Sequence, residues 1–369
     1  MKIGIDAKWY FEGPPSGKVV INNLLKYLIN QNVKHEIYVF LKRDEENIVF
    51  PFERDNVKLV YVWGKNNQLS NLFVVPHYLK KYKIDVALFF DFAPLFTKTK
   101  KIIFVCDAIF KSNPEYFTLA ERLYFSTIKI LSQKSDLVLT ISNYERARLI
   151  RYDIGKNKEI EVIYMGVDAK YKPVADKNSI EVQLVKEKYH IPDRFLFYVG
   201  RINVRKNIPN LLHAIEFIND KSIKLVIAGK KDWKSFDLPR HLKKYGLEDR
   251  VVTIGFVEDV DLPIIYSIAE VFCYVSFEEG FGLPPLESLA SGVPVVVSNT
   301  SSLPEVCGEA GVYCNPNDPK DIAEKINLVL SDNKLRETKI KIGLERAKEF
   351  TWEKSAHTLI DLCEKVVAT

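Results

Sequence analysis

Two carboxylates stand eight positions apart in the second half of the chain, Glu279 before a glycine-containing turn and Glu287 after it. Pro284 and Pro285 lie between them and are tolerated only in the first turn of a helix, where their missing N–H groups have no intrahelical partner. An apolar, strand-like run at 271–275 precedes the turn. The segment therefore predicts a strand, a tight turn and a helix that hold the two carboxylates on either side of the turn.

The beginning of this helix predicts a place for a phosphate group. The backbone N–H groups of Phe281, Gly282 and Leu283 would project from the helix N-terminus, where the orphan donors and the helix dipole attract anions. A purely structural interpretation stays open for the carboxylates. In it, Glu287 is a good helix former that faces the helix dipole, and Glu279 is a solvated loop acid.

A second group of charges follows the apolar run 195–200. Arg201 and Lys206 come just past this predicted strand, at the end of an open α/β sheet where ligands bind. Arg201 can bridge two phosphate oxygens as a planar fork, and Lys206 adds a mobile point charge. Arg205, between them, is a spare cation in this interpretation. The alternative is a set of loop cations on a solvated rim.

Both segments closely resemble elements of the retaining glycosyltransferases of family 4 (GT4), which have the two-domain GT-B fold. The first is similar to their E-x7-E region and the second to their G-R-x(n)-K-N element. The resemblance implies that Glu279 lies at the donor sugar and Glu287 at the ribose of a nucleotide sugar. It also implies that Arg201 and Lys206 neutralise the donor diphosphate. It covers most of the chain and is strongest over 195–300.

Two further positions take their roles from the same resemblance. Gly17, in the segment Gly13–Lys18 before a predicted helix, corresponds to the family's glycine loop, which reaches over the diphosphate from the opposite domain. A turn without a ligand is the alternative there. Phe256 and Val257 resemble the stretch that borders the nucleobase, and Tyr266 after them could belong to the core.

The first half departs from the family pattern at one position. Many members carry a His-Asp pair after a strand, whereas this chain has Cys106 and Asp107. The family's histidine contacts the donor sugar, and a thiol is a poor replacement as a hydrogen-bonding or proton-handling group near neutral pH. We therefore expect either that Asp107 takes over this catalytic role or that the activity differs.

Neither a metal ion nor an organic cofactor is expected. The pair Asp259 and Asp261 is formally a D-x-D, which some glycosyltransferases use to hold a divalent cation on the donor diphosphate. It lies in a predicted loop away from the cationic elements, so we interpret it as a solvated cap. The five cysteines show no zinc spacing, and no G-x-G-x-x-G follows a strand.

The elements that must position these residues alternate between strand and helix in both halves. A chain of 369 residues is too long for one ordinary core and suits two α/β domains. Predicted strands are 2–6, 36–41, 57–62, 86–90, 101–105, 137–141, 195–200, 224–228, 251–254, 271–275 and 293–297. Predicted helices are 19–30, 71–82, 114–133, 208–218, 262–269, 319–330 and a final one to 367. This alternation predicts two parallel sheets, each covered on both faces.

The predicted domain organisation follows the GT-B pattern of two Rossmann-like domains that face each other across a cleft. Residues 1–172 form an acceptor-side domain, 173–190 a polar linker, and 191–351 a nucleotide-sugar-binding domain. The last helix, 352–369, is expected to pack back on the first domain, as the resemblance implies.

Charge and hydropathy suggest where the protein works. The net charge is +5, and the apolar runs are broken by charges before they could span a bilayer. No signal peptide is expected, so the predicted location is the cytoplasm, including a peripheral position at the inner membrane face. Several lysines of the first half are interleaved with aromatic residues, at Lys80, Lys81, Lys83, Lys98, Lys100 and Lys101 with Phe73, Tyr78, Tyr82 and Phe96. They could meet an anionic lipid surface or a polyanionic acceptor, or simply be solvated.

The predicted activity is transfer of a sugar, with retention, from a nucleotide-diphosphate sugar to a glycan or a lipid-linked glycan. The element Pro114–Phe117 resembles that of family 4 mannosyltransferases of surface polysaccharide synthesis, which makes GDP-mannose the first candidate donor. Nucleic acid is not an expected partner. A sugar-nucleotide 2-epimerase of the same fold is one alternative. A non-catalytic nucleotide-sugar-binding protein, suggested by Cys106, is another.

Overall fold

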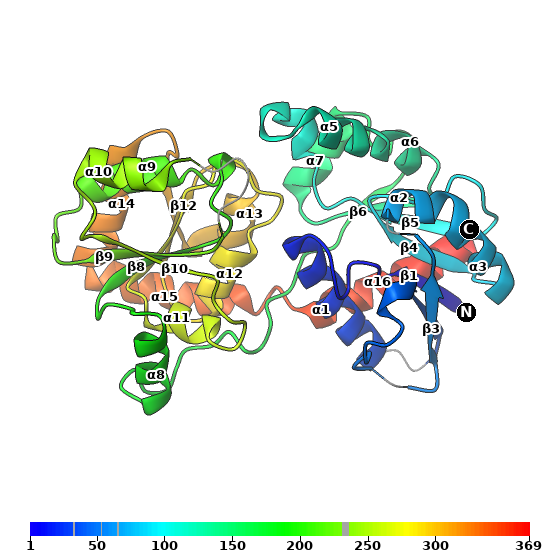
Figure 1. Ribbon diagram of the computed structural model, residues 1–369, viewed down its shortest axis with the longest axis horizontal. Coiled ribbons are helices and arrows are strands. Elements are labelled where there is room, and N and C mark those ends of the chain that lie inside the picture. The colour runs from blue at the N-terminus through cyan, green and yellow to red at the C-terminus, as the bar shows by residue number, and fades with distance from the viewer. Residues whose placement is uncertain (32–33, 53, 65, 231–235) are drawn as a thin grey trace. The chain divides into compact units, whose positions relative to one another are not determined.

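The structure is a computed structural model that describes residues 1–31, 34–52, 54–64, 66–230 and 236–369. The chain forms two compact units (Figure 1). Unit 1 comprises Met1–Gly166 together with Trp352–Thr369, and unit 2 comprises Val167–Thr351. Each unit is a parallel β-sheet flanked by helices, which is the predicted α/β class.

Unit 1 is built on a seven-stranded parallel sheet in the order β3-β2-β1-β4-β5-β6-β7. Its strands are β1 (Lys2–Asp6), β2 (Glu36–Lys42), β3 (Val57–Val62), β4 (Val86–Phe90), β5 (Lys100–Phe104), β6 (Leu137–Thr140) and β7 (Ile160–Val162). All residues of β4 and β6 are buried, as expected for strands covered on both faces. The apolar runs of the sequence predicted every strand except the three-residue β7.

The helices of unit 1 include the last one of the chain. They are α1 (Pro15–Gln31), α2 (Asn67–Leu69), the π-turn η2 (Ser70–Val74), α3 (Val75–Tyr82), α4 (Ile109–Ser112), α5 (Leu119–Ser126), α6 (Ile128–Gln133), α7 (Asn143–Arg151) and α16 (Trp352–Ala368), with the 3₁₀ turns η1 (Arg43–Glu45) and η3 (Pro114–Tyr116). Helix α16 packs along α1. The Ser355 hydroxyl donates to the Tyr164 carbonyl at 2.6 Å, and the His35 and Glu364 side chains meet at 3.0 Å.

Three predicted helices of unit 1 differ from the structure, and the one predicted over 71–82 is divided into the π-turn η2 and α3. Helix α1 begins at Pro15, four residues earlier than expected, because proline suits the first helical position, where no N–H donor is needed. The single helix predicted over 114–133 is divided into η3, α5 and α6. Thr118 caps α5 in a capping box with Glu121, which sets a new helix start inside the predicted one.

Unit 2 repeats this architecture with a six-stranded parallel sheet in the order β10-β9-β8-β11-β12-β13. Its strands are β8 (Phe195–Val199), β9 (Lys224–Ala228), β10 (Val251–Gly255), β11 (Val271–Tyr274), β12 (Val295–Ser298) and β13 (Gly311–Cys314). Its helices are α8 (Ile180–Lys188), α9 (Ile208–Glu216), α10 (Leu238–Tyr245), α11 (Leu262–Ile268), α12 (Leu283–Ala290), α13 (Leu303–Cys307), α14 (Pro319–Ser331) and α15 (Asn333–Ala347), with the 3₁₀ turns η4 (Val204–Lys206) and η5 (Gly308–Ala310).

The segment 173–190, predicted as a linker, lies within unit 2. It contains α8, whose Val182 and Val185 are buried. The Val174 N–H donates to the Ser267 hydroxyl at 2.7 Å, and the Lys188 ammonium meets the Asp261 carboxylate at 2.7 Å. The polar composition of the segment suggested a linker, whereas its buried valines and its bonds to the region of α11 attach it to the unit.

Both sheets have a switch point at which the strand order reverses, and open α/β sheets bind ligands beyond the carboxyl ends of strands at such points. In unit 2 the switch lies between β8 and β11, which are neighbours in the sheet. The loops that follow them carry both charged segments of the sequence. Among the described residues, every helix is too short or too polar to cross a membrane.

Candidate active site

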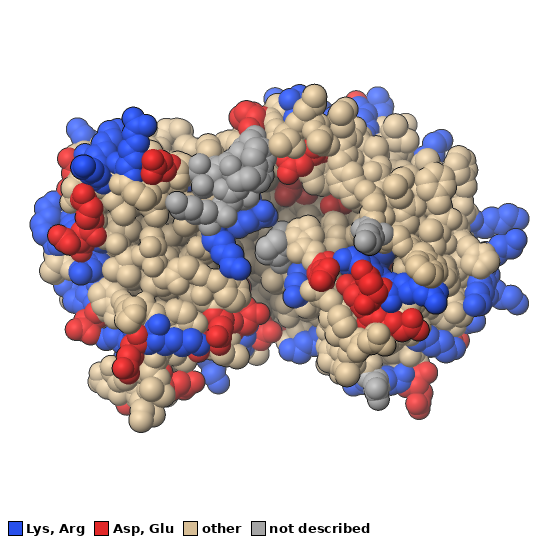
Figure 2. Space-filling view, in the orientation of Figure 1, with Lys and Arg blue, Asp and Glu red and all other residues tan. Residues whose placement is uncertain are grey.

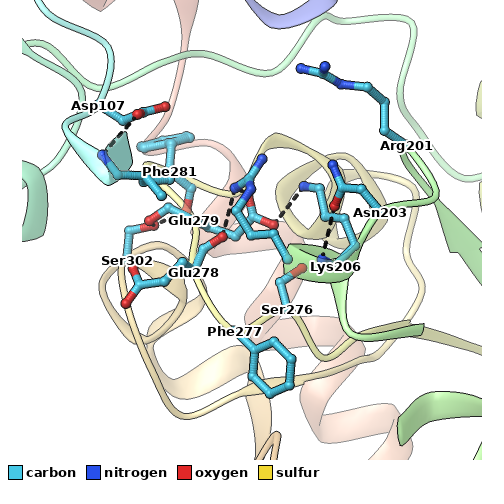
Figure 3. Close-up of polar contacts among 12 residues, drawn as sticks. Asp107, Arg201, Asn203, Lys206, Ser276, Phe277, Glu278, Glu279, Phe281 and Ser302 are labelled. Atoms are coloured by element: carbon cyan, nitrogen blue, oxygen red, sulfur yellow. Dashed lines mark hydrogen bonds and ion pairs between the residues drawn. The ribbon is translucent and has the colours of Figure 1, made fainter. Parts of the chain in front are cut away.

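The loops after β8 and β11 bring Lys206 and Glu279 together (Figure 3). The Lys206 ammonium lies 2.6 Å from Glu279 Oε1 and also donates to the Tyr274 hydroxyl. Arg205 Nη1 lies 3.1 Å from Glu279 Oε2 and 2.7 Å from the Glu278 carbonyl oxygen. A carboxylate and two cations, 73 and 74 positions away in sequence, thus form one cluster.

Two asparagines shape the loop that carries the cations. Asn203 caps the 3₁₀ turn η4, because its side-chain oxygen accepts the Lys206 N–H at 3.2 Å. Asn207 ends this turn with a left-handed φ of 56°, a conformation that asparagine adopts more readily than most residues. Its buried amide donates to the Val275 carbonyl at 2.9 Å and to the Pro316 carbonyl at 2.7 Å. These bonds join the loop after β8 to the end of β11 and to the loop after β13.

The cluster sets the ionisation of Glu279. Burial alone would raise the pKa of Glu279, but the charges of Lys206 and Arg205 outweigh burial and lower the pKa to about 2. Burial lowers the pKa of Lys206 to about 8, although Glu279 opposes this shift. Near neutral pH the three side chains therefore carry one net positive charge. Glu279 and Tyr274 occupy two of the three ammonium N–H donors of Lys206, and no described residue accepts a hydrogen bond from the third.

The contacts of Arg205 were not predicted from the sequence. The sequence suggests only a spare cation, whereas the guanidinium of Arg205 donates to the carboxylate of Glu279 and to the backbone carbonyl of Glu278. Its position next to Lys206 was the only signal in the sequence. Arg201 is exposed and projects from the same loop (Figure 3).

Glu287 has a different environment, made of tyrosines. The Tyr266 hydroxyl donates to Glu287 Oε2 at 2.9 Å, and the Tyr171 hydroxyl donates to the same carboxylate. The two tyrosine rings meet edge-on with centroids 5.7 Å apart. Burial raises the pKa of Glu287, and the two hydroxyl donors oppose this rise. Tyr266, left as a core residue by the sequence, is fully buried and also orients Glu287.

The turn between the two glutamates leads into α12 as predicted. The helix begins at Leu283, with Gly282 at the N-cap in a φ of 124° that favours glycine. No described side chain caps this end by a hydrogen bond. Phe281 is buried and packs on Phe350, with ring centroids 5.7 Å apart. The Ser302 hydroxyl bonds to the Phe281 and Glu279 carbonyl oxygens at 2.6 and 3.1 Å, which fixes the turn from behind.

The two residues predicted to flank a nucleobase differ in exposure. Phe256 follows β10 and is 62% exposed, with the Lys230 ammonium 5.2 Å from its ring centroid. Val257 is 6% exposed and belongs to the core of unit 2. Phe256 therefore presents an exposed aromatic ring at this position, whereas the Val257 side chain lies in the core.

Comparison with known proteins identifies the family. Residues 17–171 match the family model described as Glycosyltransferase Family 4, and residues 181–346 match that of Glycosyl transferases group 1. The chain is 33% identical over 288 residues to O-antigen chain mannosyltransferase B of Escherichia coli, a match that covers 76% of this chain and 69% of that protein. The chain belongs to glycosyltransferase family 4. A serotype-specific mannosyltransferase, WbdA of Escherichia coli, is 32% identical over 236 residues, which span 62% of this chain and 29% of that longer protein.

Solved structures show that this glycosyltransferase has the GT-B fold. Sucrose-phosphate synthase from Thermosynechococcus elongatus superposes with a TM-score of 0.77 at 20% identity and covers 100% of this chain and 99% of its own. Anabaena Alr3699/HepE, in complex with UDP and glucose, has a TM-score of 0.76 at 16% identity. This match covers 99% of our chain and 100% of the HepE chain. Two parallel-sheet α/β domains are the architecture that these proteins share.

In unit 1 of the glycosyltransferase, Gly17 lies in the first turn of α1 and not in a loop before the helix. The helix starts early enough to include it. A Cβ atom added at Gly17 would lie 2.8 Å from Cε3 of Trp9, so a larger residue would displace the indole ring. Close packing of this turn on Trp9 accounts for the glycine without reference to a ligand.

Asp107 follows β5, where hydrogen bonds to two acidic side chains fix the backbone of Ala108 and Ile109. Its Oδ1 accepts the Ile109 N–H at 3.2 Å, and the Ala108 N–H donates to Glu145 Oε2 at 3.1 Å. Glu145 is buried and paired with Arg148 at 2.8 Å. The sequence interpretation missed Glu145, which lies 37 positions after Ala108 and carries no local signal of this contact.

Asp91 is a further titratable group of unit 1 that the sequence did not single out. It follows β4 in a left-handed conformation with φ of 61°, next to Cys106, whose N–H donates to its carboxylate. Burial and then the charge of Asp107 raise the pKa of Asp91 to about 8. Burial, Asp91 and Asp107 also raise the pKa of the Cys106 thiol, which is therefore neutral.

The D-x-D pair has structural partners. Asp261 bonds to the Lys188 ammonium at 2.7 Å and to the Tyr189 hydroxyl at 2.8 Å, which links α8 to the start of α11. Within the described part of the chain, no three His, Cys, Asp or Glu side chains are grouped so that they could hold a metal ion.

Proposed function

We propose that this family 4 glycosyltransferase moves a sugar from a nucleotide-diphosphate sugar to a glycan or lipid-linked glycan, with retention and without a metal ion. GDP-mannose is the proposed donor because relatives with more than 30% identity are named mannosyltransferases. Synthesis of a surface polysaccharide is proposed because two relatives are named for O-antigen chains. Because nucleotide sugars are the proposed donors, we propose the cytoplasm as the place of the reaction.

The cluster of Lys206, Arg205 and Glu279 at the switch point of unit 2 is the observation that carries this proposal. It joins a net positive charge to an ionised carboxylate at the carboxyl ends of β8 and β11. A leaving diphosphate needs positive charge, and an oxocarbenium-like sugar needs a nearby negative one. The site offers both, and α12 adds a helix N-terminus for the phosphate.

The roles of the other donor-site residues follow from their chemistry. We propose that Arg201 and the third N–H of Lys206 bind the diphosphate together with the backbone of Phe281, Gly282 and Leu283. Phe256 would lie against the base through its exposed ring. Glu287 would accept the ribose hydroxyls, since its two tyrosine donors leave other lone pairs of the carboxylate for a ligand. Gly17 remains a proposed contact from unit 1.

Glu279 is proposed to position the sugar and stabilise its positive charge, and not to attack it. Both of its oxygens are already bound to cations, which makes the carboxylate a weak nucleophile. The acceptor hydroxyl would then attack on the face that the diphosphate leaves, and a donor phosphate oxygen would take its proton. Asp107 is proposed as the catalytic carboxylate that unit 1 contributes to this step.

A donor screen followed by a transfer assay tests the proposal. Thermal shifts would be measured with GDP-mannose, GDP, UDP-glucose and UDP-GlcNAc, because a ligand that binds only the folded state raises the melting temperature. We expect GDP-mannose to give the largest shift and labelled mannose to be transferred with retention in the presence of EDTA. Transfer that stops with EDTA and returns with manganese would refute the metal-free mechanism. Formation of a new epimer from UDP-GlcNAc alone would refute the transferase proposal.

A further inference from the structure

Two buried tyrosines lie beneath the loop that carries Arg201 and Lys206, the two cations proposed to bind the diphosphate. Tyr198 belongs to β8 and Tyr274 to β11, the neighbouring strands at the switch point of unit 2. Their side chains are 0% and 1% exposed, and their rings are stacked with centroids 6.0 Å apart and an interplanar angle of 20°. A buried tyrosine hydroxyl needs a hydrogen-bond partner, so the partners of these two hydroxyls indicate what the tyrosines do.

The Tyr274 hydroxyl belongs to the ion pair of Lys206 and Glu279. It accepts a hydrogen bond from the Lys206 ammonium and donates one to the Glu279 carboxylate. The ammonium and Glu279 Oε1 are 2.6 Å apart, so the three polar groups form a triangle in which each contacts the other two. The Tyr274 ring lies against the same ammonium, which is 4.7 Å from the ring centroid. These contacts fix the position of the Lys206 charge.

The Tyr198 hydroxyl holds the other cation through its backbone. It donates to the Arg201 carbonyl oxygen at 3.1 Å. Gly200 leaves room for this bond, because a Cβ atom at Gly200 would lie 2.9 Å from the Tyr198 hydroxyl oxygen. The Arg201 side chain is exposed and projects away from the core (Figure 3). The bond to its carbonyl oxygen therefore sets the place from which the guanidinium projects.

The buried triangle differs from the ion pairs at the surface. Lys58 and Glu36 of unit 1 form an exposed pair. Figure 2 shows basic (blue) and acidic (red) side chains mixed on the visible face of the protein. Exposed pairs contribute little to stability. A buried pair loses its hydration, and this loss is offset only where further hydrogen bonds satisfy the charges. The Tyr274 hydroxyl is such a partner for both Lys206 and Glu279.

Packing alone does not account for the two hydroxyls. The Phe272 ring stacks on Tyr274 with centroids 5.8 Å apart, and Phe197 is the fully buried neighbour of Tyr198 in β8. A phenylalanine in place of either tyrosine would fill nearly the same space without burying a polar group, which costs free energy unless the group is hydrogen-bonded. The hydroxyls occur near the carboxyl ends of the two strands, where they meet the cations.

We propose that Tyr198 and Tyr274 are positioning residues of the donor site, whose hydroxyls hold Arg201 and Lys206 where both reach the diphosphate. This inference rests on the proposed function, because it assigns a role in binding that donor group. Neither tyrosine has to touch the donor. Tyr274 acts on the charged group of Lys206 itself, whereas Tyr198 acts on the backbone that carries the Arg201 side chain.

Calorimetric binding of GDP, UDP, guanosine and uridine to the full chain tests the inference. Tyr198→Phe and Tyr274→Phe keep the stacked rings and lose only the hydroxyls. Each should weaken binding of the diphosphate that the unaltered protein prefers by about threefold to tenfold, the effect of one hydrogen bond. Affinity for the nucleosides should be unchanged, because they lack the group that Arg201 and Lys206 are proposed to bind. A general disturbance of the fold would weaken the binding of both classes.

The pH dependence of binding separates the two tyrosines. In Tyr274→Phe the Lys206 ammonium loses a hydrogen bond that favours its charged form, so the pKa of Lys206, about 8 in the unaltered protein, should fall. The loss of diphosphate affinity as the pH rises should therefore begin at a lower pH than in the unaltered protein. Tyr198→Phe should weaken binding by the same factor at every pH, because arginine keeps its charge.

Unit 1 offers a matched control. Tyr38 is 2% exposed, its hydroxyl donates to Glu36 Oε2 at 3.1 Å, and it accepts from the Lys58 ammonium at 3.3 Å. It therefore forms the same kind of triangle with a lysine and a glutamate outside the donor site. Tyr38→Phe should leave diphosphate affinity and its pH dependence unchanged, and a loss equal to that of the test variants would overturn the inference.

Two further results distinguish this inference from the proposed function. If neither GDP nor UDP binds the unaltered protein, the proposed function fails and the inference fails with it. If a diphosphate binds and the two variants bind it like the unaltered protein, or lose nucleoside and diphosphate affinity equally, the inference alone is overturned. An unshifted pH dependence in Tyr274→Phe would remove the role assigned to Tyr274.

Discussion

The carboxyl ends of the two sheets carry different arrangements of charged side chains. In unit 2, Glu279 is bound on both oxygens by Lys206 and Arg205. In unit 1, Asp91 and Asp107 lie near each other, and among the described residues neither forms an ion pair. The end of the unit 1 sheet also holds a paired carboxylate, Asp6, which lies 2.5 Å from the Lys8 ammonium. This end differs from the unit 2 end in that Asp91 and Asp107 lie close to each other without a cation partner among the described residues.

The comparison shows how one chemical group acquires two properties. Paired with cations, buried Glu279 has a pKa of about 2 and stays ionised. Half-buried beside another acid, Asp91 has a pKa of about 8 and holds its proton near neutral pH. The unit 2 end is suited to an anion such as a diphosphate. The acids Asp91 and Asp107 at the unit 1 end are suited to neutral hydroxyl groups, as an acceptor glycan would offer.

The largest expected effect separates the two glutamates of the proposed donor site. Glu279→Gln should lower kcat by about 10²–10³-fold, because the negative charge facing the developing oxocarbenium is lost. Glu287→Gln should chiefly raise the donor KM, because the ribose is bound alike before and during the reaction. Steady-state kinetics of both variants measure this split. Identical changes in kcat and KM would contradict the division of roles.

The second prediction concerns the ammonium group of Lys206 in unit 2. Lys206→Ala should weaken donor binding by about 10–100-fold, since a charge-assisted hydrogen bond contributes about 1.5–3 kcal/mol. In the unaltered protein, donor affinity should also fall as the pH rises past about 8, where Lys206 loses its proton. This fall should be absent in the variant. Calorimetric titrations at pH 6.5, 7.5 and 9 test both points.

A control addresses the stability of that variant. Loss of Lys206 leaves Glu279 with Arg205 as its remaining cation, so the free energy of unfolding should drop by about 3 kcal/mol or less. The double variant Lys206→Ala/Glu279→Gln should recover stability without recovering donor affinity. Donor affinity unchanged in Lys206→Ala would remove this residue from the phosphate site.

The third prediction concerns Asp91 at the carboxyl end of the unit 1 sheet. Between the unfolded pKa of about 3.9 and the folded value of about 8, the folded state keeps a proton on Asp91 that the unfolded state releases. Stability should therefore fall as the pH rises from 4 to 8. Asp91→Asn should remove this fall and stabilise the protein by about 1–3 kcal/mol at pH 8.5, with little effect at pH 4.

Urea unfolding at pH 4.5, 7 and 8.5 measures this effect. Asparagine is a suitable replacement because it also adopts the left-handed backbone of Asp91 and can accept the Cys106 N–H. Asp55→Asn, at an exposed site of unit 1, serves as the control and should leave the pH dependence unchanged. An equal pH slope in the Asp91 variant and the unaltered protein would show that Asp91 is not held in its protonated form.

The smallest expected effect concerns the tyrosines that bind Glu287. Tyr266→Phe and Tyr171→Phe should each raise the donor KM by about 2–10-fold with little change in kcat, because a hydrogen bond contributes about 0.5–1.5 kcal/mol. Without these donors the pKa of Glu287 should rise further, so loss of donor affinity on acidification should begin at a higher pH.

Kinetics and donor titrations between pH 5 and 8 test the role of the tyrosines. Tyr313→Phe removes another hydrogen-bonded hydroxyl of unit 2, one that donates to the Gly308 carbonyl at 2.5 Å, and should leave donor affinity unaltered. A fall in kcat at constant KM would place the tyrosines in the chemical step instead.

Much of the fold could be predicted because buried parallel strands are continuous apolar runs. The runs from β1 to β6 and from β8 to β12 were recognised in the sequence within two residues at either end. The strands β7 and β13 were missed, because Glu161 interrupts the short apolar run of β7 and β13 begins with a glycine. The linker prediction failed because composition does not reveal that α8 buries two valines against unit 2.

The candidate site could be located from the sequence but not assembled from it. Local chemistry, two prolines at a helix start and cations after a strand, placed Arg201, Lys206 and Glu279 after strand ends and Glu287 in the helix that follows the turn. The partners could not be found in this way. Arg205 meets Glu279 across 74 positions, and Tyr266 meets Glu287 across 21.

The sequence by itself determined what is local: the alternation of strand and helix, the turn before α12, and the residue types at the ends of β8 and β11. These follow from backbone geometry and from the apolar period within a few residues. The tertiary structure decided which groups pair and which are ionised. A pKa depends on burial and on charges a few ångströms away, and both are set by segments that meet only in the folded chain. Glu279 and Asp91 are both acids after a strand in sequence, and only the fold makes one ionised and the other protonated near neutral pH.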